Sequence, residues 1–316
     1  MVGRRHPEAM LIAGAAALAG ILAAQEPAAV PTAAATREAR AGSPAAAMRW
    51  TDPDGKPLPF RSEDALLEFL RTADVKSEKT LTSGVTFPTK LLLEKEGIRA
   101  DAIFRDVNEQ RATPISGGGR NELFFRDSYV FEPAAYELSR LLGLDNVPPA
   151  TLRKLQGKNG SVQIWVENAM TEKARIKDKA EPPDAQQWNK QLQIMNVFDA
   201  LVYNTDRNRG NMLITPDWKL WMIDHTRAFR RNADLPNADL VNQCERGMYE
   251  RLKAWDEAAV RGRLKPYLSS FEMDALMKRR KLILERLDKL IAEGGEARVL
   301  YAYTAETAPA RPGTPK

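Results

Sequence analysis

Cysteine and histidine are nearly absent from this chain of 316 residues, which has one cysteine, Cys244, and two histidines, His6 and His225. A single cysteine excludes a disulfide within the chain, and so few thiol and imidazole groups argue against a cysteine- or histidine-rich zinc site. The sequence also lacks the Gly-x-Ser-x-Gly nucleophile elbow and the Walker A phosphate loop. Zinc hydrolases and elbow-type serine hydrolases are therefore disfavoured.

A block of like charge is also missing, although the formal net charge at pH 7 is +5. Lysine and arginine are spread along the chain, so the charge permits binding to nucleic acid without indicating it, and we expect no nucleic-acid partner. Apolar residues make up 43% and charged residues 28% of the chain, as in ordinary globular proteins. A chain of this length can bury a sizeable core as one bilobal unit or as two small domains.

Long apolar runs are confined to the N-terminus, where a basic stretch at residues 4–6 precedes an apolar run at 9–24. This layout is typical of a signal peptide. The run is short for a membrane span, which needs about 20 residues. A cleaved signal, an uncleaved anchor and a cytoplasmic alanine-rich tail stay open, and we expect an exported or membrane-anchored protein. Residues 1–48 are assigned to the signal or anchor and an Ala/Pro-rich linker.

Apolar periodicity predicts strands first and helices afterwards. An amphipathic helix is predicted over Ser62–Ala73, and a β-hairpin follows with its turn at Glu96 and Gly97. A polar loop containing "SGGG" leads to a helix with Pro133 in its first turn, which ends near Gly143. A second hairpin turns within "GKNG", and the rest of the chain is mainly helical. This order predicts an α+β protein in two lobes.

Three oxygen-bearing side chains gather in the segment "YNTDRNRGNMLITPDWKLWMIDHTRAF". Asp206 and Asn211 lie in a loop after a buried helix, and the following hairpin brings Asp224 back to that loop. Such residues also cap helices and form Asx-turns. The order of buried helix, polar loop, apolar strand and terminal Asp instead favours a site in which a divalent cation is bound and a free carboxylate accepts a proton, as phosphoryl transfer requires.

The segments "DRNRGN" and "MIDHTRAF" resemble the catalytic and metal-binding loops of atypical kinases, which include phosphatidylinositol kinases, HipA-type kinases and the secretory-pathway kinases of the Golgi lumen. Two further segments are similar to the secretory-pathway family. "FEPAAYELSRLLGLDNVPPAT" resembles its helix and Val-Pro-Pro turn, and "GSVQIWVE" resembles the strand that enters the adenine-binding hinge. The resemblance spans roughly residues 77–300 and implies a bilobal protein-kinase-like fold with a β-rich N-lobe and a helical C-lobe.

By this resemblance the protein binds ATP with Mg²⁺ or Mn²⁺ and transfers the γ-phosphate to a hydroxyl of a protein, sugar or lipid. Asp206 would be the catalytic base, and Asn211 and Asp224 the metal ligands. Glu132 would be the helix carboxylate that pairs with a basic residue or the metal, with Glu137 as the alternative. These two residues lie about 140° apart around a helix, so both cannot point into one site.

The nucleotide-binding residues also follow from the resemblance. Gln163, Trp165 and Val166 would line the hinge, and residues 81–90 would form the loop over the phosphates. Where the resemblance expects a lysine on a strand, the sequence has Arg105, a planar fork in place of a compact charge. Three interpretations stay open: Arg105 takes over the role, Lys90 reaches in from the neighbouring strand, or the protein is a catalytically weak pseudokinase.

The resulting division of the chain has a helical extension at 49–76, an N-lobe at 77–167, a C-lobe at 168–303 and a tail at 304–316. The first alternative to a kinase is a pseudokinase that acts as a nucleotide- or partner-binding module. The second is an envelope binding module in which the acidic loop holds Ca²⁺ for structure.

Overall fold

The computed structural model describes residues 50–81, 87–111, 115–117, 120–122 and 125–303. The predicted signal or anchor with its linker, residues 82–86 of the predicted phosphate loop and the C-terminal tail therefore lie outside the described residues. Within the described ranges, no helix combines the length and the apolar character that a membrane crossing requires.

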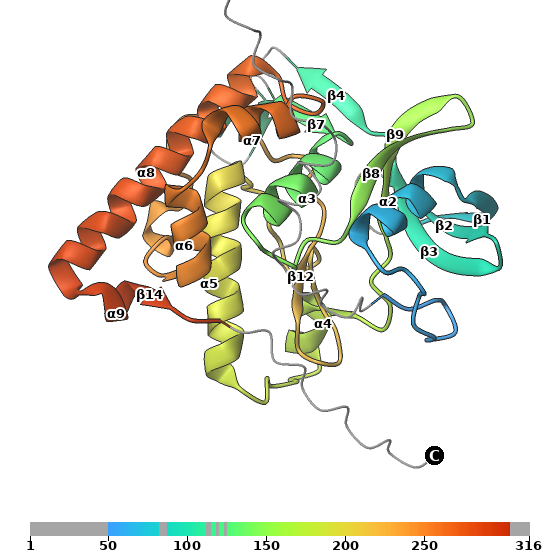
Figure 1. Ribbon diagram of the computed structural model, residues 1–316, viewed down its shortest axis with the longest axis horizontal. Helices are drawn as coiled ribbons and strands as arrows, with labels where there is room; N and C mark the ends of the chain where they lie inside the picture. Colours follow the sequence, from blue (N-terminus) through green and yellow to red (C-terminus); the bar gives the residue numbers. More distant parts are fainter. Residues whose placement is uncertain (1–49, 82–86, 112–114, 118–119, 123–124, 304–316) are drawn as a thin grey trace, which may run out of the picture. The chain divides into compact units, whose positions relative to one another are not determined.

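A five-stranded antiparallel sheet forms the β-rich part, with the strand order β1-β2-β3-β9-β8 (Figure 1). Helix α2 (Glu63–Thr72) begins at the N-cap Ser62, whose hydroxyl accepts a hydrogen bond from the Ala65 N–H. Leu66 and Leu70 of this helix are buried in one core with side chains of the sheet. The strands are β1 (Asp74–Thr80), β2 (Thr89–Lys95), β3 (Ile98–Arg105), β8 (Ala150–Leu155) and β9 (Lys158–Ile164).

The register of the strands determines which side chain lies at the end of the five-stranded sheet. The predicted hairpin is confirmed, since β2 and β3 pair from Thr89 opposite Phe104 to Lys95 opposite Ile98. Arg105 is the last residue of β3 and pairs with Ser161 of β9. Arg105 therefore lies where the sheet ends.

Helix α3 (Phe131–Leu141) follows two short hairpins, one of β4 (Asn108–Arg111) with β7 (Phe125–Ser128) and one of β5 (Ile115–Gly117) with β6 (Arg120–Glu122). The polar loop predicted around "SGGG" thus contains strand residues at Ser116 and Gly117. This polar segment lacks the alternation of apolar and polar residues that predicts a strand. Helix α3 ends as predicted near Gly143, which has a left-handed φ of 65°.

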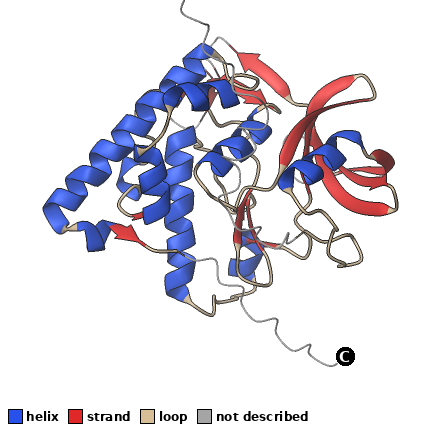
Figure 2. Cartoon of the chain, in the orientation of Figure 1, coloured by secondary structure: helices blue, strands red, loops and turns tan. Residues whose placement is uncertain are grey.

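Helices dominate the remainder of the chain (Figure 2). Helix α5 (Ala185–Val202) and helix α8 (Ser270–Gly294) contribute to a second large core, which also contains the apolar face of α3. A small sheet contains β10 (Met170–Thr171), which precedes α5, and β11 (Met212–Ile214) and β12 (Leu220–Met222), which follow the loop after α5. The other elements are α4 (Glu172–Lys177), η1 (Ala238–Leu240), β13 (Cys244–Glu245), α6 (Arg246–Lys253), α7 (Glu257–Leu264), α9 (Glu296–Val299) and β14 (Leu300–Tyr301).

Candidate active site

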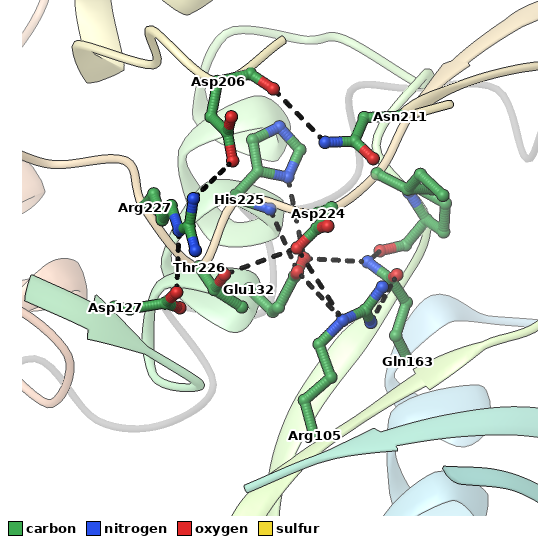
Figure 3. A network of polar contacts seen from close by, with 12 residues as sticks. Arg105, Asp127, Glu132, Gln163, Asp206, Asn211, Asp224, His225, Thr226 and Arg227 are labelled. Carbon is green, nitrogen blue, oxygen red and sulfur yellow. Dashed lines mark hydrogen bonds and ion pairs between the residues drawn. The ribbon is translucent and has the colours of Figure 1, made fainter. Parts of the chain in front are cut away.

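Glu132 lies at the centre of a polar network, in the first turn of α3, with its side chain fully buried (Figure 3). Its Oε1 accepts a hydrogen bond of 3.0 Å from the His225 backbone N–H, and its Oε2 accepts one of 3.3 Å from Gln163 Nε2. Arg105 Nε lies 3.6 Å from Oε1. Burial alone would raise the pKa of Glu132, but the charge of Arg105 and the contacts with His225 outweigh it and lower that pKa to about 2. Glu132 is a buried anion.

Asp224 lies just after β12, where the chain leaves the small sheet. Its backbone φ of 62° is left-handed, a conformation that is uncommon for a residue with a side chain and is often found at functional sites. Its Oδ1 accepts a hydrogen bond of 3.3 Å from the Thr226 hydroxyl and lies 4.0 Å from Arg105 Nε. The side chain is 34% exposed, in contrast to Glu132, so it can reach a ligand.

Asp206 is held by the loop that follows α5. Asn204 Oδ1 accepts a hydrogen bond from the Asp206 N–H, and Asn211 Nδ2 donates one of 3.3 Å to the Asp206 carbonyl oxygen. The Asp206 side chain is 43% exposed. Partial burial raises the pKa of Asp206 above its usual value, with Arg227 opposing that shift and Asp224 adding to it. An accessible carboxylate with a raised pKa is suited to accept a proton from a hydroxyl.

Arg227 fixes the position of the Asp206 carboxylate. Its Nη1 lies 3.3 Å from Asp206 Oδ2, and its Nε donates a hydrogen bond of 2.7 Å to the buried Asp127 at the end of β7. The hairpin before α3 is thereby connected to the loop after α5 (Figure 3).

The residues predicted to bind nucleotide separate into two groups. Arg105 and Gln163 lie in the network, where Arg105 Nη1 and Gln163 Oε1 are 3.4 Å apart. Lys90 instead forms an ion pair of 2.6 Å with Asp101, and its Nζ lies 4.4 Å from the centre of the Trp165 ring.

Two further predicted residues have other surroundings. Val166 is buried in the core of the five-stranded sheet. Glu137 faces away from the network and forms a hydrogen bond of 2.6 Å with Arg263. The structure thus brings together Arg105, Glu132, Gln163, Asp206, Asn211 and Asp224.

Solved structures share this arrangement of elements. A hydra Fam20 structure with sugar matches with a TM-score of 0.58 and 17% identity, over 75% of this chain and 91% of the other. A Golgi casein kinase with Mn and ADP bound matches with a TM-score of 0.57 and 17% identity, over 78% of this chain and 80% of the other. The chain has the fold of the atypical kinases. No family model and no curated protein matches the sequence.

A divalent cation fits the donor set at the candidate site. Among the residues that the structure describes, no group of three or more His, Cys, Asp and Glu side chains is arranged to hold a metal ion. Asn211 and Asp224 supply one amide and one carboxylate. Mg²⁺ is usually held by one or two carboxylates together with water and substrate phosphates, so a nucleotide would complete the coordination.

Sequence reasoning missed four residues that support the candidate site: Asp127, Arg207, His225 as a partner of Glu132, and Arg227. All three arginine and histidine residues lie within the segments that carry the resemblance: Arg207 directly follows Asp206, His225 directly follows Asp224, and Arg227 lies three residues after Asp224. This adjacency was the available signal. Asp127 gave none, because its role depends on a contact with Arg227, 100 residues further along the chain.

Proposed function

We propose that this protein is an ATP- and metal-dependent kinase that transfers the γ-phosphate to a hydroxyl group. The observation that carries the proposal is the convergence of Asp206, Asn211 and Asp224 beside the buried pair of Arg105 and Glu132. Phosphoryl transfer asks a protein to position the nucleotide, neutralise its charge and orient the attacking hydroxyl, and these residue types meet those needs. The fold shared with a kinase that holds Mn and ADP supports the same assignment.

Each residue has a role in this proposal. Asn211 and Asp224 would hold the divalent cation, which when bound draws electron density from the phosphate oxygens. Asp206 Oδ1 or Oδ2 accepts the proton of the acceptor hydroxyl as its oxygen bonds to the γ-phosphorus, while the bond from that phosphorus to the bridging oxygen breaks and ADP leaves. Arg105 presents its guanidinium to the phosphates and is held there by Glu132. Gln163 fixes Glu132 and Arg105 at the end of the sheet, and Trp165 and Val166 follow it at the hinge.

The acceptor is a protein, a sugar or a lipid, and the N-terminal pattern favours an exported or anchored protein. The Golgi casein kinase and Fam20 neighbours support that location by analogy. Determining the mature N-terminus after fractionation of tagged protein tests it, since a cytoplasmic chain with an intact N-terminus contradicts export.

The decisive test compares the parent with Asp206→Asn. We expect both to bind Mn²⁺-ATP with similar affinity by calorimetry, and we expect the variant to transfer phosphate at least about 100-fold more slowly, because it lacks the base. Dephosphorylated casein, an alkyl glycoside and phosphatidylinositol vesicles represent the three acceptor classes. Transfer that is independent of Asp206 contradicts the assigned base.

A second candidate function is a pseudokinase that binds nucleotide or a partner without transferring phosphate. The observation that favours it is Arg105 in place of the expected lysine, because guanidinium and ammonium groups are not interchangeable at a phosphate. Nucleotide binding by the parent without transfer to any of the three acceptors, or to water, identifies this alternative.

A further inference from the structure

Arg207 connects four parts of the chain around the candidate base. Its Nε and Nη2 form a two-pronged pair with Asp199 of α5, each at 2.9 Å. Its Nη1 donates to the carbonyl oxygens of Asn211, at 2.9 Å, and Ile223, at 2.6 Å. These two carbonyls belong to Asn211 itself and to the residue directly before Asp224. Arg207 therefore holds the backbone at the two expected metal ligands at a fixed separation.

The contact between Arg207 and His225 fixes the tautomer of the histidine. Arg207 Nη2 and His225 Nε2 are 2.9 Å apart. A guanidinium has only donors, so Nε2 must accept this hydrogen bond and the ring hydrogen must lie on Nδ1. The ring is fully buried and packs edge-on against Phe198. The ring of His225 thus has Nε2 as its acceptor toward Arg207 and Nδ1 as its donor.

The donor side of His225 faces Glu132. Nδ1 lies 3.6 Å from Glu132 Oε2, which is longer than a hydrogen bond, while the His225 backbone N–H donates to Oε1 at 3.0 Å. Glu132 in turn pairs with Arg105. A continuous series of buried polar contacts therefore runs from Asp199 through Arg207, His225 and Glu132 to Arg105.

We infer that Arg207 and His225 are positioning residues, which couple the phosphate-binding pair Arg105 and Glu132 to the loop that holds Asp206, Asn211 and Asp224. This inference rests on the proposed kinase function. Buried hydrogen bonds in a low dielectric medium are strong when every polar group has a partner, and losing one partner is costly. The loss of the His225 side-chain contacts should therefore disturb both Arg207 and Glu132. Misplacement of reacting groups by about 1 Å can cost 100-fold in rate.

Variants of His225 can distinguish a positioning role from a role in packing alone. His225→Phe keeps an aromatic ring against Phe198 and the backbone hydrogen bond to Glu132, but it removes the side-chain contacts with Arg207 and Glu132. His225→Gln keeps an acceptor near Arg207, and His225→Asn keeps a donor near Glu132. We expect kcat for Mn²⁺-ATP turnover to fall about 100-fold in the Phe variant and about tenfold in the other two, with the Mn²⁺-ADP affinity lowered at least threefold in the Phe variant.

Arg207→Lys tests the other link, because an ammonium cannot reach Asp199, the two carbonyls and His225 together. A double variant with His225→Phe should be no slower than the slower single variant, since both break one series of contacts.

Arg280→Lys is the matched control, as Arg280 also donates to two carbonyl oxygens, those of Leu252 and Lys253, in a different region. We expect it to lower stability while kcat stays within twofold of the parent.

The outcomes for the inference and for the proposed function are distinct. An active parent whose His225→Phe variant keeps kcat and nucleotide affinity within twofold overturns the positioning role while leaving the kinase proposal intact. A parent that binds Mn²⁺-ADP but transfers phosphate to nothing overturns the kinase proposal, and the affinities of the His225 variants then decide the positioning role. A parent that binds no nucleotide overturns both.

Discussion

Arg105 stands where a lysine is expected and forms a buried pair with Glu132. It is 5% exposed, and Glu132 is 0% exposed, so neither charge is compensated by water. A guanidinium can contact Glu132, Gln163 and Asp224 at once because its donors form a planar fork. A lysine could make fewer of these contacts. This geometry favours the interpretation in which Arg105 takes over the lysine role, and it leaves Lys90 with Asp101.

Removing the Arg105 charge should leave the buried Glu132 carboxylate without its cation. We expect Arg105→Met to lower the free energy of unfolding by about 3 kcal/mol, because the remaining buried carboxylate has lost its cation. The double variant with Glu132→Gln should recover part of that loss, as Gln carries no charge. Urea denaturation measures both.

The control for this prediction is an exposed ion pair. Arg261→Met breaks a contact with Glu257 on the surface of α7, and we expect a loss below about 1 kcal/mol. An equal loss in Arg105→Met would contradict a buried, charge-dependent pair.

Glu167 gives stability a pH dependence near neutrality. Burial, with the neighbouring Asp101 charge adding and Lys90 opposing, raises its pKa from 4.5 to about 7. The folded state thus holds the proton more tightly than the unfolded state, so this group's contribution is fully present below pH 4.5 and is lost as pH rises through 7. We expect Glu167→Gln to flatten the fall in stability across that window. Urea midpoints at pH 4.5, 6 and 7.5 check this, and parallel profiles for both proteins would refute it.

At the scale of elements, the pairing of β3 with β9 delivers Arg105 to the site. Gly160 of β9 packs against β3 so closely that a Cβ added there would lie 2.3 Å from the Phe104 ring and 2.5 Å from the Arg105 carbonyl oxygen. The carbonyl belongs to the backbone and cannot rotate away. Glycine is therefore required at this position by contact with its neighbour rather than by its own backbone conformation.

Gly160→Ala should separate the two strands at the point where Arg105 begins. We expect the free energy of unfolding to fall by about 2 kcal/mol and Mn²⁺-ADP affinity to weaken as well. Gly262→Ala is the control, because a Cβ there meets no atom within 4 Å and alanine favours the helix α7. That variant should gain about 0.5 kcal/mol. Normal stability in Gly160→Ala would contradict the close packing.

At the scale of the whole molecule, two cores frame the candidate site. One joins α2 to the five-stranded sheet, and the other joins α3, α5 and α8. Glu132 extends from α3, whose apolar face belongs to the second core, to Arg105 of the sheet. Nucleotide that binds to residues of both parts would stabilise the folded state as a whole.

A ligand present at 100 times its Kd stabilises a folded protein by about 2.7 kcal/mol. We therefore expect saturating Mn²⁺-ADP to raise the melting temperature by roughly 5 °C. Excess EDTA should abolish the rise, and Asp224→Asn should reduce it. Thermal melts with Ca²⁺ alone test the alternative of a structural calcium site, which predicts stabilisation without nucleotide.

Much of the architecture could be predicted from local patterns. The helix at Ser62, the hairpin at Glu96 and Gly97, and the helix that ends near Gly143 all follow from caps, turn residues and apolar spacing, which act within a few residues. The hairpins around residues 108–128 could not be predicted, because their strands are short and polar.

The sequence by itself determined the order of elements and the candidate residues Asp206, Asn211 and Asp224, because short-range patterns and one compact segment carry that information. Only the tertiary structure decided that Arg105 rather than Lys90 meets Glu132, that Glu137 points elsewhere, and that Arg207 and His225 join the parts. These features depend on strand register and on contacts between residues far apart in the chain. A buried charge without a partner is costly, so the fold pairs the charges that it buries.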